Sequence, residues 1–580
     1  MEQTKKKKIV FYSVAYAVAF LLAFLVYYVA LPPLNVYSVG FWIYFAFLTF
    51  IFVIPTYIYR CDFKILFGSI KIAMTKKRVV APGTEPVPAP KKQEKPIKAT
   101  GKFKFPLICI CLIPLAVLLI GGLFSTKMFY AHSYANVISV TESDFKSDMP
   151  ETSKVTHIAL MDTETAKIIG NRTLGSLSHV VSQYEVSEYY NQINYQGTPK
   201  KVANLEYAGF FKWLGNRKNG VPGYVMVDPV DNGAQYVELE KPLKYVESGY
   251  FGDDLKRKLR FSYPTKIFGE ISYEIDENGN PMYIVPCMKP RVGLFGAMDV
   301  HEVIIFDPCT GDSTICPVNE SPAWIDEVYD GYLACEKYNW KGMLSGGWLN
   351  SIFGNKDCKK TTDDFGYVIL GDDVWYYTGV TSVNSDKSNI GFILTNARTG
   401  EYKFYPVIGA EEHSAMAAAE GEVQEKGYVA SFPALVNVSG QATYIMVLKD
   451  AGGLVKLYAL VNVEQYSIVA TDTTQEKAID AYKKLLVSEG IISNTANPPP
   501  QDTHDVMSEI TVSDIRIATV NNNSVAYISA IYNEKLCVFK KSISEDESIM
   551  LISVGDTISV SAYKTEDDRI YLIDTWSFKE

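Results

Sequence analysis

The 580-residue sequence lacks the short motifs that mark the common hydrolytic and nucleotide-dependent enzymes. It contains no Gly-x-Ser-x-Gly, no His-Glu-x-x-His and no Gly-x-x-x-x-Gly-Lys, which removes three familiar sites for a serine nucleophile, a zinc ion and a phosphate group. Histidine is scarce, and its six residues are scattered singly, which argues against a local metal site. The sequence therefore predicts no catalytic residue, no metal and no cofactor.

Glycine and proline are also too few, at 39 and 27 residues, for a collagen or a low-complexity polymer. A composition that is 48% hydrophobic and 21% charged excludes wholesale disorder. The 39 tyrosines and 29 phenylalanines favour sheet-rich packing over a helical bundle.

Charge is entirely missing between Ile9 and Tyr59, and only Pro32 and Pro33 interrupt this apolar stretch. Since two adjacent prolines cannot continue a helix, the stretch predicts a helical hairpin whose arms each have the ~20 residues needed to cross a bilayer. A third apolar run follows at 105–124. We expect a membrane anchor in residues 1–124, with transmembrane helices at about 9–30, 39–59 and 105–124.

The two parts of the chain carry opposite charge. Residues 1–104 have a net charge of +12, and residues 105–580 have −21, which together give the −9 of the whole chain. Basic segments flanking spans stay in the cytoplasm, so both the N-terminus and the proline-rich loop 60–104 are expected there. Three crossings would then place the C-terminal bulk outside the cytoplasm, at the cell membrane.

Beyond the third span, apolar residues alternate with polar ones and turn residues recur at short intervals, which predicts an α+β region dominated by sheets. Hairpins are expected at 271–285 and 444–461, and a helix with a Thr-x-x-Glu capping box from Thr473. We divide this extracytoplasmic region into two parts, 135–300 and 301–490.

One short pattern occurs twice in the second part. An apolar strand leads into Asp307-Pro-Cys-Thr-Gly-Asp, and another leads into Asn396-Ala-Arg-Thr-Gly-Glu, followed by a further strand. An Asp or Asn side chain can cap such a turn, and glycine adopts positive φ without steric cost. The expected turn residues are Asp307, Thr310, Gly311, Asn396, Thr399 and Gly400.

The second copy runs into a predicted short helix at 410–421, and this arrangement resembles the PepSY-type modules of bacterial envelope proteins. The resemblance implies an extracytoplasmic binding or inhibitory module. The chain as a whole is similar to large membrane-anchored surface proteins of Gram-positive bacteria that have no assigned function, which implies a location and no chemistry.

The last block, 506–580, follows a stiff linker that contains Pro498, Pro499 and Pro500. Five alternating segments with a Gly-Asp entry to the fourth resemble a small OB-type barrel. Such barrels can bind oligonucleotides or oligosaccharides. No nucleic acid is expected outside the membrane, so we interpret the block as a structural or protein-docking β-barrel.

Six of the nine cysteines lie beyond the spans, and an even number permits disulfides whose connectivity the sequence leaves open. Aromatic residues also gather in a region rich in glycine and aspartate, where loops can present rings to a sugar or a peptide. The competing interpretation is that these rings cover the sheet core. The candidate surface-binding residues are Trp340, Trp348, Asp372, Asp373, Trp375, Tyr376 and Tyr377.

The sequence thus favours a non-enzymatic, membrane-anchored cell-envelope protein that binds or scaffolds an extracytoplasmic protein or a cell-wall polymer. Two alternatives stay open. A cell-wall hydrolase or transferase would need convergent carboxylates with opposed pKa shifts in one cleft. A transmembrane sensor would need a signalling role for the loop 60–104.

Overall fold

The computed structural model describes residues 2–56, 104–152, 160–230, 233–362, 364–383, 388–492, 506–520, 523–533, 535–543, 546–564 and 569–579. The chain forms two compact units, Met1–Ile491 and Ile492–Glu580. The predicted cytoplasmic loop and the proline linker lie almost wholly outside the described residues.

Two N-terminal helices are long and apolar enough to cross a membrane. They are Ile9–Ala30, within α1 (Glu2–Ala30), and Val39–Thr56. The Tyr16 and Thr56 hydroxyls form a hydrogen bond of 2.8 Å, and the Tyr44 hydroxyl donates to the Ala23 carbonyl at 3.0 Å. The predicted hairpin of two spans is therefore present.

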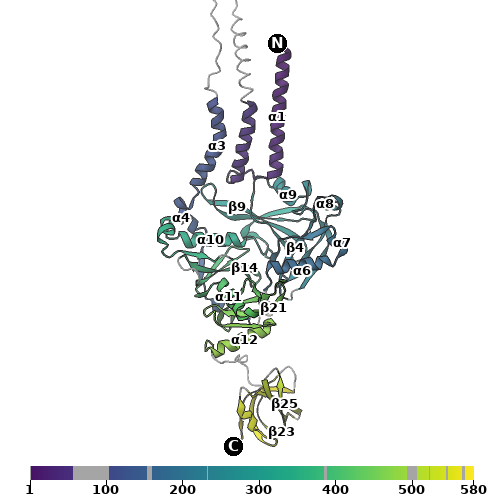
Figure 1. The fold of residues 1–580 in the computed structure, drawn as a ribbon, viewed down its shortest axis with the longest axis vertical. Helices are drawn as coiled ribbons and strands as arrows, with labels where there is room; N and C mark the ends of the chain where they lie inside the picture. Colours follow the sequence, from purple (N-terminus) through teal and green to yellow (C-terminus); the bar gives the residue numbers. More distant parts are fainter. Residues whose placement is uncertain are drawn as a thin grey trace, which may run out of the picture. The chain divides into compact units, whose positions relative to one another are not determined.

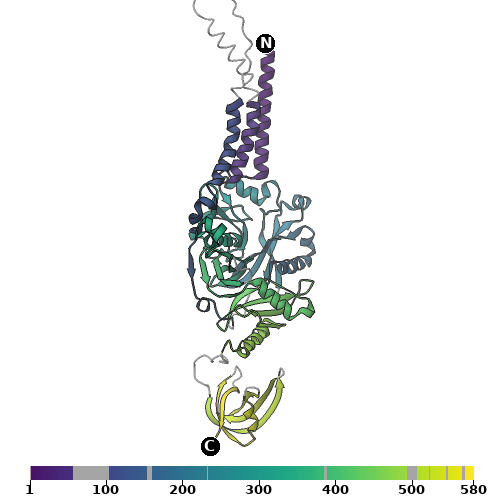
Figure 2. The ribbon, with the colours of Figure 1, turned by 60° about the vertical axis from the view of Figure 1, so that its left-hand side comes forward.

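The third expected span is only partly supported. Helix α3 (Lys104–Leu123) runs alongside the hairpin (Figures 1 and 2), but it meets the length and apolarity needed for a span only together with α4 (Lys127–Ala135). The pair is bent by 55°. Two helices thus have the length and composition of membrane spans, and a third span depends on whether this bent pair crosses as one element.

Four sheets fill the rest of the first unit, and antiparallel hairpins dominate each of them. The first has the order β2-β4-β5-β6, with β3 beside β4, and helix α6 (Thr163–Gly175) packs on β5 and β6. The second has the order β11-β10-β9-β7, with β8 beside β9. Their strands are β2 Tyr184–Val186, β3 Asn191–Tyr195, β4 Thr198–Tyr207, β5 Val221–Asp228, β6 Gly233–Leu243, β7 Ile267–Phe268, β8 Ser272–Ile275, β9 Pro281–Val292, β10 Gly296–Phe306 and β11 Ser313–Pro317.

The other two sheets lie later in the chain. The seven-stranded sheet has the order β1-β16-β15-β14-β12, in which β1 is parallel to β16, and α10 (Gly331–Leu344) contacts β12 and β14. The last sheet carries α11 (Glu412–Glu422) and α12 (Gln475–Ser488). Their strands are β1 Val140–Glu142, β12 Lys359–Thr361, β13 Gly366–Leu370, β14 Asp373–Ser382, β15 Ser388–Asn396, β16 Tyr402–Tyr405, β17 Gly409–Ala410, β18 Val429–Ala430, β19 Ala434–Val438, β20 Gln441–Lys449, β21 Val455–Asn462 and β22 Val469–Asp472.

The division expected between residues 300 and 301 is wrong, because it falls inside strand β10. This strand pairs with β9 on one side and β11 on the other, so a boundary there would split a continuous ladder. The hairpins predicted at 271–285 and 444–461 correspond to β8–β9 and β20–β21. The helices predicted at 410–421 and from Thr473 are α11 and α12. The predicted capping box is wrong, because Thr474 caps α12 and accepts from the Lys477 amide at 3.4 Å.

The second unit is a closed five-stranded barrel, as the alternating pattern predicts. Its strands follow the order β23-β24-β25-β27-β26, and β26 pairs back with β23 to close it. The core is built from apolar side chains on alternate positions, among them Ile528, Phe539 and Ile558. The strands are β23 Val506–Val520, β24 Asn523–Tyr532, β25 Lys535–Ser542, β26 Thr557–Lys564 and β27 Ile570–Phe578.

The two repeated turns connect β10 to β11 and β15 to β16. The Asp307 carboxylate accepts from the amides of Cys309 at 2.7 Å and Thr310 at 3.2 Å. The Asn396 side chain accepts from the amides of Arg398 at 2.9 Å and Thr399 at 2.8 Å. In each turn the glycine has positive φ and lies against a tyrosine ring. The two turns therefore share their packing as well as their capping.

Gly400 provides a test of this packing. An alanine Cβ there would lie 2.8 Å from the Tyr329 ring, at a φ of +73°, whereas one at Gly197 would meet nothing within 4 Å at a φ of +75°. Both substitutions strain the backbone at positive φ, but only Gly400→Ala must also displace a buried ring. We expect Gly400→Ala to lower the free energy of unfolding by about 1–3 kcal/mol more than Gly197→Ala in urea titrations. Equal losses would contradict the role of the tyrosine.

Candidate functional site

A cavity of about 350 Å³ lies where three of the sheets meet. Strands β3 and β4 supply Gln192 and Lys201, the segment before α6 supplies Asp162, and β14 supplies Tyr377. The remaining lining residues are Leu160, Met161, Thr163, Tyr332, Asp364, Phe365, Gly366, Tyr367, Phe432, Pro433 and Ala434. Segments about 270 residues apart in the sequence therefore form one site, which we call the Lys201 cavity.

Lys201 is the unusual group in this cavity. It lies in the inner strand β4, opposite Gln192 of β3 and Val227 of β5, and is 3% exposed. Its ammonium nitrogen is 5.2 Å from the centre of the Tyr367 ring. Within the described part of the chain, no hydrogen-bond acceptor or carboxylate is paired with this ammonium. A buried cation in this state is costly unless it meets a partner.

Two lysines that can be compared with Lys201 are both paired. Lys200, on the opposite face of the same strand, is paired with Asp228. Lys337, which is equally buried at 3% exposure, lies 2.6 Å from the Asp299 carboxylate. The missing partner is therefore a feature of Lys201 rather than of buried lysines in this protein.

Burial lowers the pKa of Lys201 to about 8, although the charges of Asp162 and Glu327 partly oppose this shift. At neutral pH the charged form still predominates, because the solution is more acidic than this pKa. The cavity therefore presents a cation that is set deep in the fold.

Asp162 lies in the cavity wall but has a structural role. Its carboxylate caps α6 by accepting from the Thr165 amide at 2.9 Å and is paired with Lys449 of β20. Burial acts to raise its pKa, but the hydrogen bonds from Lys449 and Thr165 outweigh burial, and the pKa is lowered overall. Asp162 is thus paired with Lys449 and forms no ion pair with Lys201, although its charge partly opposes the lowering of the Lys201 pKa.

A cluster of carboxyl groups lies near the cavity without lining it. Glu274 is fully buried and accepts from the backbone amides of Asp326 at 2.8 Å and Glu327 at 2.9 Å. Burial raises the pKa of Glu274 well above its usual value, raises that of Asp326 to about 7, and also raises that of Glu327. The pKa of Asp162 is thus lowered while the pKa values of these three carboxyl groups are raised. These three groups, however, do not line the cavity that Asp162 lines.

Aromatic rings form the wall and rim of the Lys201 cavity. Tyr332, which is 76% exposed, lies 5.2 Å from Phe365 between ring centres, and Tyr377 stacks on Phe432 at 6.2 Å. A deep cation with aromatic walls suits a ligand that combines an anionic group with an apolar or ring-shaped part.

The predicted aromatic surface requires a correction. Trp340, Trp375, Tyr376 and Tyr377 are all at most 5% exposed, and the structure instead places their rings in the hydrophobic cores. Trp348 is half-buried beside Trp340 in the same cluster. Alternation along β14 sends successive rings to opposite faces, and both faces are covered. Of the five rings, only Tyr377 lines the Lys201 cavity.

The two predicted aspartates do not form a binding pair either. Both Arg398 nitrogens that face Asp373 lie within 3.0 Å of its carboxylate, in a forked ion pair. Asp372 is exposed, and its backbone carbonyl accepts from Asn194 at 3.1 Å. Asp373 therefore braces the turn after β15, and Asp372 stands apart from the cavity.

The sequence patterns considered above do not single out Lys201 as a site residue, although one local feature points to it. Adjacent lysines at 200 and 201 sit in a strand, where neighbouring side chains point to opposite faces. If both faces of that strand are covered, one lysine must be buried. Nothing local shows that the second face is covered, since β13 and β14 lie more than 160 residues away.

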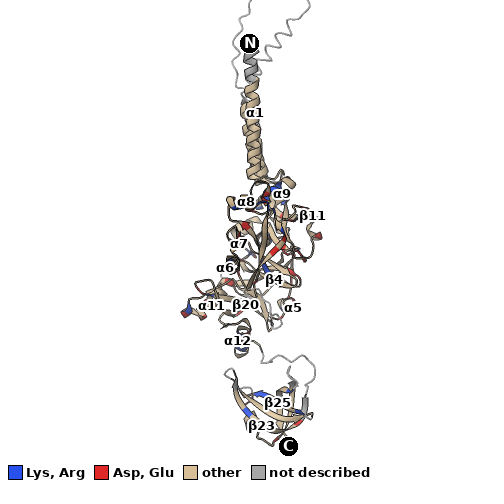
Figure 3. Ribbon diagram, turned by 90° about the vertical axis from the view of Figure 1, so that its right-hand side faces the viewer, with Lys and Arg blue, Asp and Glu red and all other residues tan. Residues whose placement is uncertain are grey.

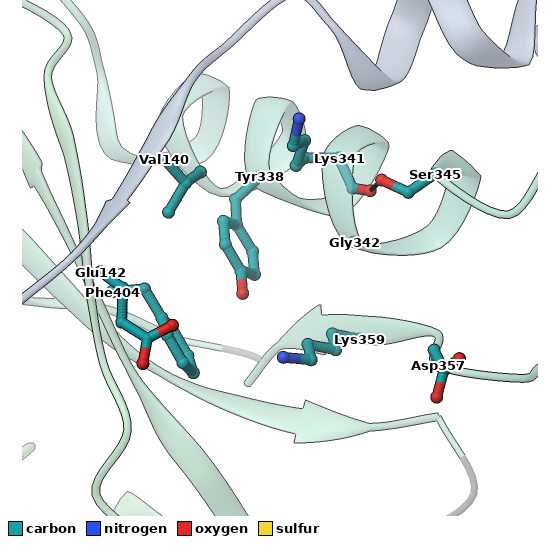
Figure 4. A pocket seen from close by; sticks show the side chains of 9 residues that line it. All are labelled: Val140, Glu142, Tyr338, Lys341, Gly342, Ser345, Asp357, Lys359 and Phe404. Atoms are coloured by element: carbon teal, nitrogen blue, oxygen red, sulfur yellow. Dashed lines mark hydrogen bonds between the residues drawn. The ribbon is translucent and has the colours of Figure 1, made fainter.

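A second pocket, of about 250 Å³, lies between α10, β1, β12 and β16 (Figure 4). Lys341, Lys359, Glu142 and Asp357 line it, so positive and negative groups are equal in number. The Lys359 ammonium lies 5.0 Å from the centre of the Phe404 ring. Its charged groups reach solvent, so we regard the Lys201 cavity as the stronger candidate.

Among the residues that the structure describes, no group of three or more His, Cys, Asp or Glu side chains could hold a metal ion. The described cysteines, including Cys287, Cys309, Cys316, Cys335, Cys358 and Cys537, are all free thiols. The disulfides considered from the sequence are therefore not formed in this structure.

No protein-family model matches the chain, and a search of curated proteins also finds no match.

Proposed function

We propose that this chain is a non-enzymatic, membrane-anchored protein of the cell envelope whose first unit binds an anionic group of a protein or wall-polymer partner in the Lys201 cavity. The observation that carries the proposal concerns Lys201, a residue that is 3% exposed and lines the cavity beside the Tyr367 ring. Among the described residues, its ammonium has no hydrogen-bond acceptor and no ion-pair partner. An anionic ligand would supply the missing counter-charge. The N-terminus is cytoplasmic in this proposal, and the sheet-rich bulk is extracytoplasmic.

The orientation rests on charge and on the third span. Residues 1–104 carry +12, and basic flanks are retained in the cytoplasm. If α3 and α4 cross as one bent element, the number of spans is odd and the folded bulk lies on the far side. Protease added to intact cells should then digest the bulk, and a cytosolic reporter signal from a fusion at Glu580 would contradict this orientation.

The C-terminal barrel has a supporting role in the proposal. Its strand order and closure support the OB-type resemblance. Barrels of this type serve as binding modules. The PepSY-type resemblance of the repeated turns also remains a proposal. We propose that the barrel docks a protein or polymer partner and no nucleic acid.

Binding should be tested with the full chain in lipid nanodiscs, passed over immobilised wall polymer and over a solubilised membrane extract. We expect one of the two materials to retain the protein. Lys201→Gln should weaken this binding about tenfold, since a hydrogen bond to a charged group contributes roughly 1.5 kcal/mol or more. Lys200→Gln is the matched control, because its side chain lies on the other face of β4 and is paired with Asp228. Retention by neither material, or equal losses in both variants, would remove the proposal.

The two alternatives have less support. The hydrolase or transferase alternative requires carboxyl groups with opposed pKa shifts in one cleft, whereas Asp326 and Glu327 do not line the Lys201 cavity. The sensor alternative rests on the loop 60–104, which is almost entirely outside the described residues.

A further inference from the structure

Helix α9 (Leu255–Ser262) is attached to the end of the first apolar helix. The Arg257 side chain donates to the Tyr28 carbonyl at 3.3 Å, and the Arg260 side chain donates to the Leu31 carbonyl at 2.9 Å. The Arg257 guanidinium also lies 4.4 Å from the centre of the Tyr28 ring. Arginine therefore satisfies carbonyls that the end of α1 leaves open, and α9 is held where the span ends (Figure 1).

An exposed aromatic surface lies next to α9. It is formed by α8 (Phe210–Asn216) and the short helix η3 (Phe251–Asp253), and we call it the α8–η3 surface. Phe211 is 82% exposed, Phe251 56% and Leu214 50%. Large apolar side chains that cluster in this way on a folded surface mark an interaction site.

The α8–η3 surface is firmly tied to α9. The Arg257 side chain donates to the Phe251 carbonyl at 2.8 Å. The Trp213 indole donates to the Asp253 carboxylate at 3.1 Å, and its ring lies 5.7 Å from that of Phe251. The exposed rings are therefore held at a fixed position relative to the end of α1.

The charge of this surface is basic once its ion pairs are counted. Asp253, Asp254 and Glu247 are paired with Arg217, Arg257 and Lys256. Lys212 in α8 and Lys218 just after it have no carboxylate partner among the described residues. Basic residues therefore occur in α8 and α9, at the end of α1 (Figure 3).

We propose that the α8–η3 surface docks onto the interface of the same bilayer that anchors the chain. Phe211 and Phe251 would insert at the level of the lipid headgroups, where aromatic rings are favoured, and Lys212 and Lys218 would meet lipid phosphates. A bilayer is the occupant that fits, because the surface is continuous with the end of a membrane-spanning helix and combines apolar rings with free cations. The inference rests on the proposed anchoring and adds a second membrane contact, made by the folded region.

The test is photocrosslinking of the full chain in nanodiscs that contain anionic lipid. Benzoylphenylalanine is placed in turn at Phe211, at Tyr466 and at Phe20, and lipid adducts are measured by mass spectrometry. Tyr466 is the matched control, because it is 55% exposed but lies between β21 and β22, in the sheet that carries α12. Phe20, in α1 and 66% exposed, reports the anchoring itself.

We expect lipid adducts at 211 and at 20, with a yield at 211 at least severalfold above that at 466. Lys212→Gln with Lys218→Gln should lower the yield at 211 severalfold, since each lysine near an anionic surface contributes about a fivefold factor. Adducts at 20 but none at 211 would overturn the docking proposal and leave the anchoring intact. A crosslink from 211 to a second copy of the chain would also overturn it, and no adducts at 20 would refute the anchoring.

Discussion

Replacing Lys201 with methionine is expected to raise the free energy of unfolding of the first unit by roughly 3 kcal/mol at pH 7, because each unit of pKa shift corresponds to about 1.36 kcal/mol. The pKa of Lys201 falls from 10.5 to about 8 on folding, and the side chain is 3% exposed. The charged ammonium therefore destabilises the folded state. Methionine fills a similar space without the charge. A gain in stability with a loss of partner binding is typical of a functional residue.

The pH dependence of this effect has a definite sign. The unfolded chain holds the Lys201 proton up to about pH 10.5, whereas the folded chain releases it near pH 8. The penalty is therefore complete below pH 8 and disappears between pH 8 and pH 10.5. Urea unfolding of the full chain in detergent should show a large difference between variant and wild type at pH 7, and a small one at pH 10.

Lys337→Met is the matched control for Lys201→Met. This lysine is equally buried, but it is paired with Asp299. Its removal leaves a buried carboxylate that still contacts Arg291 at 3.2 Å and the Val300 amide at 3.0 Å. Breaking a buried pair costs about 3–5 kcal/mol, and Arg291 should reduce that cost. We expect Lys337→Met to destabilise the protein at pH 7. If Lys201→Met destabilised it as well, Lys201 would have a partner inside the fold and the ligand-binding proposal would lose its basis.

The second large effect is expected at Glu412, in the first turn of α11. This residue is fully buried, and its carboxyl group accepts from the Gly379 amide of β14 at 2.6 Å. Burial raises the pKa of Glu412 from 4.5 to about 7. Replacement by the neutral isostere in Glu412→Gln should therefore raise the free energy of unfolding by up to roughly 3 kcal/mol at pH 8.

Because the folded pKa of Glu412 lies above the unfolded one, its stability cost appears as pH rises. Both states are protonated below pH 4.5, so the variant should match the wild type there. The cost grows between pH 4.5 and pH 7 and is complete above pH 7. Glu411→Gln, at the neighbouring and less buried position, should change stability by less than about 0.5 kcal/mol at either pH. An equal gain for Glu412→Gln at pH 4.5 and pH 8 would show that charge is not the cause.

Local sequence patterns were sufficient for much of the architecture. The uncharged stretch with Pro32 and Pro33 predicted a helical hairpin, and alternating segments predicted the closed C-terminal barrel. These features depend on residues close together in the chain, whose spacing sets helical or extended geometry. The sequence did not predict the 55° bend between α3 and α4, because the bend depends on how these helices pack against the folded region.

The candidate site could not be predicted in the same way. The rings of β14 have the composition of a displayed surface, yet they are buried because other segments cover both faces of that strand. Composition reports which side chains can bind a ligand, and it does not report which of them reach solvent.

The sequence by itself determined the apolar helices, the sheet-rich bulk, the capped turns at Asp307 and Asn396, and the opposite charges of the two ends. Only the tertiary structure decided that Lys201, rather than Lys200, lines a cavity and has no ion-pair partner among the described residues. The physical reason is that strand periodicity sends the two lysines to opposite faces, whereas burial is set by segments that meet only in the folded chain. Asp162, Lys201 and Tyr377 belong to one site because three sheets converge there. The sequence pattern of any one sheet does not predict this convergence.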